Sequence, residues 1–225
     1  MPDVLDLQEY SLHMHQRFYP LIRRYGYRIA YEGEEPWNNT PIFYNPETVE
    51  LVDVNYVLYA PSCWSNIGSK SYTSAVFRKK DTGRLFAVVN THLWWKSEAA
   101  QPGSTYARAA QVRLMMAEAE VLKNKYGCTI FVTGDMNAYE DSLPIRQFIE
   151  GGYTPCYKAA TDATDNGNGH HICGPKDGYS RTSRRRSPDR EKGAIDHCFI
   201  CNAQKGVAVK VFDCITARFT VKLTD

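Results

Sequence analysis

Apolar residues recur along the chain at two spacings, one typical of helices and the other typical of strands. The helical spacing predicts a helix over residues 11–24, ending before Gly26, and a longer helix over 104–125, ending before Gly127. A third, shorter helix is predicted near residues 142–149. The apolar face of the longest helix is expected to carry five residues: Ala107, Ala110, Leu114, Ala117 and Val121.

Short apolar runs predict strands, and two pairs of runs are separated by turn residues. Residues 41–44 and 50–54 flank a proline turn and are expected to form a hairpin. Residues 72–79 and 85–91 flank a turn containing glycine and are expected to form a second hairpin. Further strands are predicted at 4–7, 27–31, 128–133, 194–201, 207–214 and 218–223. Strands dominate, so the fold class is expected to be α+β, with two packed sheets and helices outside.

Length and composition are those of one soluble globular domain over residues 1–225, since 43% of the residues are hydrophobic and 23% are charged. The formal net charge of +2 identifies no class of partner, and no obligate protein partner is evident. No apolar run approaches the roughly 20 residues that span a bilayer, and no signal peptide opens the chain. The compartment stays open: cytoplasmic, or exported by a signal outside this segment.

Seven cysteines form no recognisable disulfide framework, so reduced, buried thiols are expected. Cys198 and Cys201 have the spacing of zinc ligands, and His170 and His171 lie upstream, so a zinc-dependent hydrolase is one alternative. However, Cys198 and Cys201 fall in a predicted strand, where residues three apart point to opposite faces. This geometry favours reduced, buried cysteines that bind no metal over a zinc site.

Polar residues stand at or near the ends of four apolar strands. A single such residue is explained by the preference of Asp and Asn for turns. Four strands with this feature indicate instead that polar side chains meet at one edge of the sheets, where loops assemble functional sites. The residues are Glu9, His92, Asp135 with Asn137, and Asp196.

These residue types suit the hydrolysis of a phosphate ester. Glu9 is an oxygen ligand suited to Mg²⁺, which binds one or two carboxylates together with phosphate oxygens. His92 and Asn137 can donate hydrogen bonds to a phosphoryl oxygen, and Asp135 can orient or deprotonate an attacking water. Asp196 can hold a histidine in the tautomer that a general base requires.

Four short motifs, taken in order, resemble those of the endonuclease/exonuclease/phosphatase superfamily, which includes DNase I-like enzymes. The resemblance covers nearly the whole chain and implies a four-layered α/β sandwich. It also implies Mg²⁺- or Mn²⁺-dependent hydrolysis of phosphate esters, from nucleic acids to phosphorylated small molecules and lipid headgroups. The motifs are Leu5-Asp-Leu-Gln-Glu9, Val89-Asn-Thr-His-Leu93, Gly134-Asp-Met-Asn137 and Ala194-Ile-Asp-His197.

The resemblance implies roles for individual residues. Glu9 corresponds to the metal-binding glutamate, and His92 to the histidine that helps to place the phosphate. Asp135 and Asn137 correspond to the pair that handles the water and the scissile phosphate, and Asp196 to the aspartate that supports the catalytic histidine.

Three more positions match the superfamily less directly. Lys70 falls where many relatives have arginine, and a lysine contacts a phosphate as a point charge. Arg108 is a second candidate for substrate binding. Arg108 and Gln111 also match a recurrent pattern that is more often structural than catalytic.

Two elements of the superfamily, an initial strand that ends in a metal-contacting Asn and a final Ser-Asp-His, have no counterpart in residues 1–225. The resemblance therefore implies that this segment alone has little or no activity, and that the full-length form is the enzyme. The other alternative is an inactive binding module of the same fold.

Substrate identity is not fixed by the sequence. Residues 151–193, rich in Gly, Asp, Asn, Arg and Pro, predict a long surface loop, and its basic run 181–192 suits either a polyanionic substrate or solvent. Trp94 and Trp95 follow His92 and can either stack on a base or sugar or pack against the core.

Overall fold

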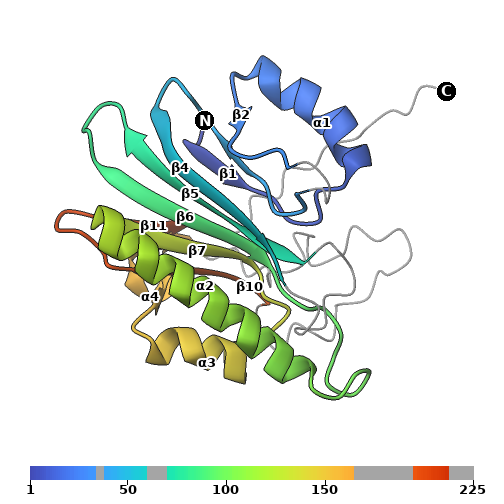
Figure 1. Cartoon of the computed structure of the whole chain (residues 1–225). Helices are drawn as coiled ribbons and strands as arrows, with labels where there is room; N and C mark the ends of the chain where they lie inside the picture. The colour runs from blue at the N-terminus through green and yellow to red at the C-terminus, as the bar shows by residue number, and fades with distance from the viewer. Residues whose placement is uncertain (34–37, 60–69, 165–194, 213–225) are drawn as a thin grey trace.

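Two β-sheets pack face to face at the centre of the molecule, and helices cover their outer faces (Figure 1). The computed structural model describes residues 1–33, 38–59, 70–164 and 195–212. The smaller sheet has the strand order β1 (Val4–Asp6), β3 (Ile42–Tyr44), β2 (Arg28–Ile29). The larger sheet has the strand order β4 (Val49–Leu58), β5 (Ser71–Lys79), β6 (Leu85–His92), β7 (Thr129–Asp135), β10 (Asp196–Cys201), β8 (Thr154–Pro155).

Three clusters of buried side chains define the layers. Helix α1 (Leu12–Arg24) packs on the outer face of the smaller sheet, where Phe18 meets Phe43 edge to face. A second cluster, which includes Ile42 and Val88, lies between the two sheets. The largest cluster lies between the larger sheet and two helices, α2 (Ser104–Tyr126) and α3 (Leu143–Glu150). The layer order is therefore helix, sheet, sheet, helices, and the predicted α+β class is confirmed.

Strands β6 and β7 run parallel, whereas the other neighbours in the described part of the larger sheet are antiparallel. Helix α2 connects the two strands and ends at Gly127, whose positive φ of 59° lets the chain turn back into β7. Parallel strands end at the same edge of a sheet, so His92 and Asp135, the last residues of β6 and β7, are neighbours.

The predicted hairpin of residues 72–79 and 85–91 is confirmed as the antiparallel pair β5–β6. The predicted hairpin of 41–44 and 50–54 is wrong. The turn itself is present, because the Asn45 carbonyl accepts hydrogen bonds from the backbone of Thr48 and Val49. However, β3 pairs with β1 and β2, while β4 pairs with β5, so this turn carries the chain from one sheet to the other.

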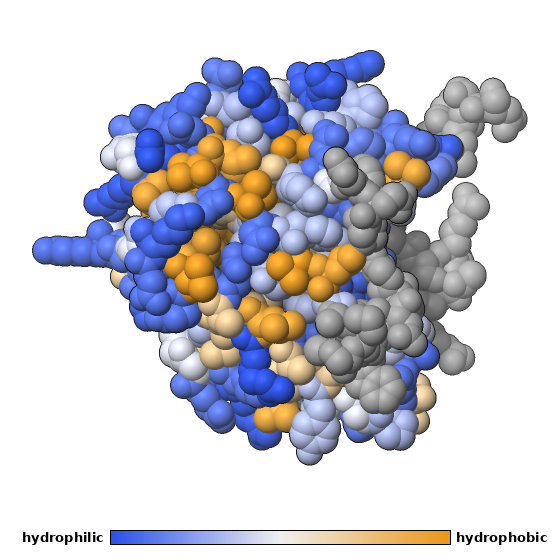
Figure 2. Space-filling view, in the orientation of Figure 1, coloured by the Kyte–Doolittle hydropathy of each residue, from blue (hydrophilic) through white to orange (hydrophobic). Residues whose placement is uncertain are grey.

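The predicted apolar face of the longest helix is wrong in large part, although its first residue, Ala107, is buried. Leu114 and Val121 are 43% and 58% exposed, and the helix instead buries a neighbouring stripe that contains Arg108 and Gln111. Apolar patterning misses this stripe because three of its buried members, Ser104, Arg108 and Gln111, are polar. In the orientation of Figure 1, in which α2 crosses the front, hydrophobic residues form several separate patches among hydrophilic ones (Figure 2).

Residues 151–193 are not loop throughout. They begin with β8 and continue into a short helix, α4 (Cys156–Ala159), and β9 (Ala160–Thr164), which pairs in parallel with β11 (Val209–Phe212). These short elements depend on distant partners, which local sequence does not reveal. The rest of that stretch, including the basic run 181–192, and the strand predicted at 218–223 lie outside the described residues. Within the described parts, no helix is both long and apolar enough to cross a membrane.

Candidate active site

Three of the predicted site residues lie in a row across neighbouring strands. His92 of β6 is opposite Asp135 of β7, and Asp135 is in turn opposite Asp196 of β10. Directly opposed residues on adjacent strands project from the same face of a sheet. Asn90 and Thr133, two residues before His92 and Asp135, bond to Leu7 and Asp6, so the row faces the smaller sheet at the edge where β6 and β7 end.

The end of β7 is shaped by two residues with positive φ. Gly134 has φ 139°, and a Cβ there would lie 2.0 Å from the carbonyl oxygen of Thr91 on β6. Asn137 has φ 47°, the left-handed conformation that Asn tolerates better than most residues. Its backbone N–H donates to Asp135 Oδ1 at 2.9 Å, and its side chain donates to the Leu93 carbonyl at 3.2 Å. These bonds fix Asp135 and Asn137 against the end of β6.

Lys70 and His92 are both buried and in direct contact, with Lys70 Nζ 2.5 Å from His92 Nε2. Burial, together with the Lys70 charge, lowers the pKa of His92 to about 3. Burial lowers the pKa of Lys70 to about 8, although Asp135 and Glu9 act in the opposite direction. At neutral pH, His92 is thus uncharged and accepts a hydrogen bond from the Lys70 ammonium.

This protonation state defines the contact between His92 and Asp135. His92 Nε2 lies 3.5 Å from Asp135 Oδ2. Because the imidazole is neutral, the contact is not an ion pair, and among the described residues Lys70 is a cation that interacts with the Asp135 carboxylate. Lys70 therefore belongs to the same cluster as the row, and its charge acts on Glu9 as well.

Glu9 follows a strand of the smaller sheet and lies close enough to the cluster for its charge to act on Lys70. It lies three residues beyond the end of β1, exposed and with a positive φ of 56°. The segment before it is held by Asn90 of β6, whose side chain accepts from Gln8 Nε2 at 2.6 Å and donates to the carbonyls of Leu7 and Pro41. Sequence reasoning missed Asn90, although an amide inside the apolar run of β6 was the available signal.

The loop after β6 is anchored by α2. Arg108 donates to the carbonyls of Trp94 and Lys96, at 3.2 and 2.8 Å, and Gln111 accepts from the Trp94 backbone at 2.9 Å. Trp94 is buried, whereas Trp95 is 53% exposed. Arg108 as a substrate contact stays a prediction, because its described hydrogen bonds are to this loop.

Solved structures share this architecture at low sequence identity. The mannosyl-6-phosphatase of Bacteroides thetaiotaomicron is similar with a TM-score of 0.70, over 93% of this chain and 73% of that one, at 20% identity. An endonuclease/exonuclease/phosphatase of Bacteroides vulgatus is similar with a TM-score of 0.67, over 93% and 76%, at 21% identity. The human Nocturnin catalytic domain gives a TM-score of 0.63, over 88% and 69%, at 18% identity.

The chain has the endonuclease/exonuclease/phosphatase superfamily fold.

Sequence comparison covers less of the chain than the fold does. RNA exonuclease NGL1 of Saccharomyces cerevisiae is 31% identical over 83 residues, which are 33% of this chain and 21% of that protein. The chain thus matches about a fifth of the length of this curated relative. No family model matches the chain. The superfamily resemblance of the motifs is confirmed at the level of the fold, while the roles of individual residues stay predictions.

The cysteines of β10 do not form a common site on this superfamily fold. Cys201 packs into the core beneath α2, and Cys198 lies on the opposite face beside Cys156. His197 also points away from the row, and its Nε2 lies 2.7 Å from the Ala138 carbonyl oxygen. Across the described residues, no three His, Cys, Asp or Glu side chains are grouped to hold a metal ion. His170 and His171 lie outside those residues.

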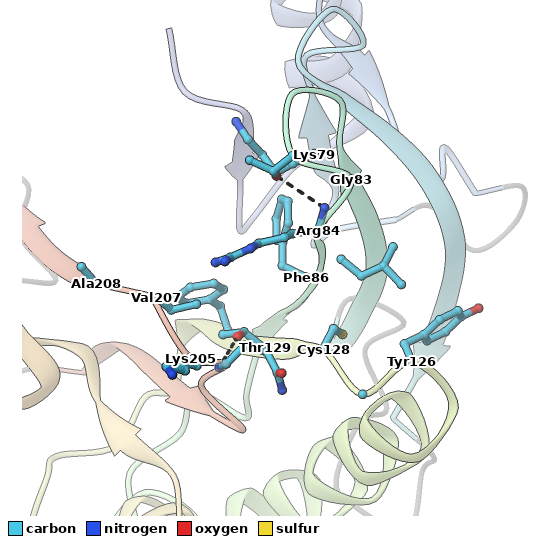
Figure 3. A pocket seen from close by; sticks show the side chains of 15 residues that line it. Lys79, Gly83, Arg84, Phe86, Tyr126, Cys128, Thr129, Lys205, Val207 and Ala208 are labelled. Atoms are coloured by element: carbon cyan, nitrogen blue, oxygen red, sulfur yellow. Dashed lines mark hydrogen bonds between the residues drawn. The ribbon is translucent and has the colours of Figure 1, made fainter.

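A pocket of about 810 Å³ lies at the other end of the sheet (Figure 3). It is lined by Leu85 and Thr129, the first residues of β6 and β7, and by the cationic Lys79, Arg84 and Lys205. The length of β6 separates this pocket from His92 by roughly 20 Å at the usual rise of a strand. The pocket is therefore no part of the candidate active site.

The buried, neutral state of His92 predicts a pH dependence of stability. In the unfolded chain His92 gains a proton below about pH 6.5, whereas in the folded chain its pKa is about 3. Between about pH 6.5 and pH 4 the unfolded state therefore binds more protons than the folded state. Well inside this window, His92 lowers the free energy of unfolding by about 1.4 kcal/mol for each unit by which the pH falls. His92→Asn should flatten this slope in urea titrations at stepped pH.

His13→Asn is the matched control, because His13 is exposed. Asp6 contributes with the opposite sign, since burial raises its pKa to about 6, but it is unchanged in both variants. Equal slopes in wild type and His92→Asn would show that His92 is not buried in its neutral form.

Proposed function

We propose that this protein is a divalent-metal-dependent phosphoesterase, in which water attacks a phosphoryl group in line. The observation that carries the proposal is the row of His92, Asp135 and Asp196 on neighbouring strands, together with the contact of Lys70 with His92. Carboxylates, an imidazole and a cation at one edge of a rigid sheet suit phosphoryl transfer, which depends on positioning and on neutralising charge.

The phosphoryl group is proposed to bind between Lys70, His92 and Asn137. The Lys70 ammonium supplies positive charge in a buried setting, where its interaction with an anion is stronger than in water. Since His92 Nε2 accepts from Lys70, the ring proton lies on Nδ1, and His92 also holds the ammonium in place. Asn137, fixed by its bonds to Asp135 and Leu93, is a further donor candidate.

Asp135 is proposed to orient the attacking water and to take its proton. Oδ1 accepts from the Asn137 backbone, so the carboxylate is held in one orientation, and Oδ2 faces His92. Asp196 is next in the row. It is proposed to keep a histidine in the tautomer that general-base catalysis requires, as the resemblance to the superfamily implies.

Glu9 is proposed to hold Mg²⁺ or Mn²⁺. One exposed carboxylate fits such an ion, because Mg²⁺ is usually bound by one or two carboxylates while its other positions are taken by water and phosphate oxygens. When bound, the ion would neutralise charge on the phosphoryl oxygens. The electrostatic action of Glu9 on Lys70 supports a location beside the phosphate site.

The names of similar proteins span several phosphate esters, so the substrate class is kept at that level. They include a mannosyl-6-phosphatase, an RNA exonuclease and ANGEL2, described as a 2',3'-cyclic phosphatase. Nucleic acid, a phosphorylated small molecule and a lipid headgroup all agree with an anion site at the row.

Metal removal tests the proposal. The 225-residue chain and the complete product of its gene would be assayed side by side on a phosphodiester and a phosphomonoester. Chelation should abolish hydrolysis of at least one ester, and Mg²⁺ or Mn²⁺ should restore it. Glu9→Gln should raise the metal concentration needed for half-maximal rate, whereas Glu47→Gln, on the turn between the sheets, should leave it unchanged.

Restoration by Zn²⁺ alone would favour the zinc-dependent alternative. No turnover of either ester by either protein would favour the inactive binding module. The expectation that the segment alone has little activity stays a prediction, which the comparison of the two proteins measures.

A further inference from the structure

Two cysteine thiols that have no part in the proposed hydrolysis lie in contact at β10. The sulfur atoms of Cys156 and Cys198 are 3.1 Å apart. Strand β8 is antiparallel to β10, with Phe199 opposite Pro155 and Ile200 opposite Thr154. Continuing this register by one residue puts Cys198 directly opposite Cys156, the first residue of α4.

Cross-strand opposition suits a disulfide. Opposed residues of antiparallel strands have Cα atoms about 4.5–5.5 Å apart, which falls inside the range of about 4.4–6.8 Å found across disulfides. The extended register and the 3.1 Å separation of the sulfur atoms indicate that the two thiols can be joined with little movement of either backbone segment. Cys128 and Cys201 belong to the core beneath α2, on the other face of the sheet, so neither competes for Cys198 in the described structure.

We propose that Cys156 and Cys198 are a site of reversible oxidation, at which hydrogen peroxide converts the two thiols into a disulfide that joins α4 to β10. One sulfur, as thiolate, attacks a peroxide oxygen, the O–O bond breaks and hydroxide leaves, giving a sulfenic acid. The second sulfur attacks the sulfenic sulfur and displaces a second hydroxide. The two thiol protons convert both hydroxides to water, so the thiols lose two electrons and the peroxide gains them.

The surroundings favour Cys156 as the first nucleophile. The hydrogen bond from Cys198 lowers the pKa of the Cys156 thiol, and the same bond, together with the nearby Asp6 carboxyl, raises the pKa of Cys198. Cys156 is buried, but Cys198 is exposed, so a small peroxide that reaches Cys198 is also next to Cys156. The partner thiol is then in contact and closes the disulfide before further oxidation.

Mass spectrometry of the folded protein tests the proposal directly. After peroxide treatment, free thiols are blocked by an alkylating reagent and the protein is digested with trypsin. We expect the peptide 147–158, which holds Cys156, to be linked to 193–205, which holds Cys198 and Cys201. Cys201 should carry the alkyl group, and dithiothreitol should separate the two peptides.

Matched variants identify the sulfurs. Cys201→Ser should keep the link, and Cys198→Ser should lose it. Wild type and Cys201→Ser should also gain roughly 5–10 °C in melting temperature on oxidation, because a disulfide restricts the unfolded chain, whereas Cys156→Ser should gain nothing. Alkylated Cys156 and Cys198 after treatment, or a link to any other cysteine, would overturn the proposal. These measurements do not involve hydrolysis, so they stand or fall separately from the proposed function.

Discussion

Asp135→Asn is expected to lower the rate of phosphate-ester hydrolysis by about 10²–10⁴-fold, the usual effect of losing a general acid or base. Asparagine has nearly the same shape, and its carbonyl oxygen can still accept the Asn137 backbone hydrogen bond that Oδ1 receives. What is lost is the negative charge beside His92 and Lys70, and with it the capacity to take a proton from water. Turnover at saturating substrate and metal measures the effect.

The control is Asp141→Asn, which makes the same charge change at an exposed position on the following loop. Its turnover and its thermal unfolding should match the wild type. Asp135→Asn should unfold at nearly the wild-type temperature, so that lost turnover reports on chemistry and not on folding. Near-normal turnover in Asp135→Asn would mean that Asp135 is only a turn residue.

Gly134→Ala is expected to destabilise the fold by about 3–6 kcal/mol, from backbone strain and from steric overlap of the new methyl group. Gly134 has φ 139°, a conformation that residues with a side chain rarely adopt. The new Cβ would also lie 2.0 Å from the backbone oxygen of Thr91 on β6, which cannot move without breaking the β6–β7 pairing. Urea unfolding monitored by circular dichroism measures the loss.

Gly127→Ala separates the two causes. Gly127 also has a positive φ, of 59°, but a Cβ there would meet no atom within 4 Å. This control should lose only about 1–2 kcal/mol, the cost of the left-handed conformation. If the free energy of unfolding fell by the same small amount in both variants, the close approach of β7 to β6 at Gly134 would be contradicted.

The grouping of the candidate site residues at strand ends was predictable because strand ends are visible in the sequence. The apolar runs 85–91 and 128–133 indicated two strands with polar residues just beyond them. In the structure both strands extend further, to His92 and Asp135, because backbone pairing with neighbours continues past the apolar residues. The sequence therefore indicated that these residues lie near strand ends but did not reveal the register that aligns them.

Features that depend on contacts between distant segments were not predictable in the same way. The contact of Lys70 with His92 joins residues 22 positions apart, and the contact of Cys156 with Cys198 joins residues 42 positions apart. The change of sheet between β3 and β4 likewise depends on which strands each one meets, not on the turn between them. Hydrophobic periodicity reports which face is buried, but not which partner buries it.

The hydrogen bonds of Asn90 also limit how the molecule can move. This fully buried side chain, on the larger sheet, bonds to two separate segments of the smaller layer, at Leu7 and Gln8 and at Pro41. Sliding one sheet along the other by a single residue, about 3.3 Å, would break all of these bonds at once. Shear between the sheets is thereby blocked next to the row, and motion that admits a substrate is confined to the loops beyond the strand ends.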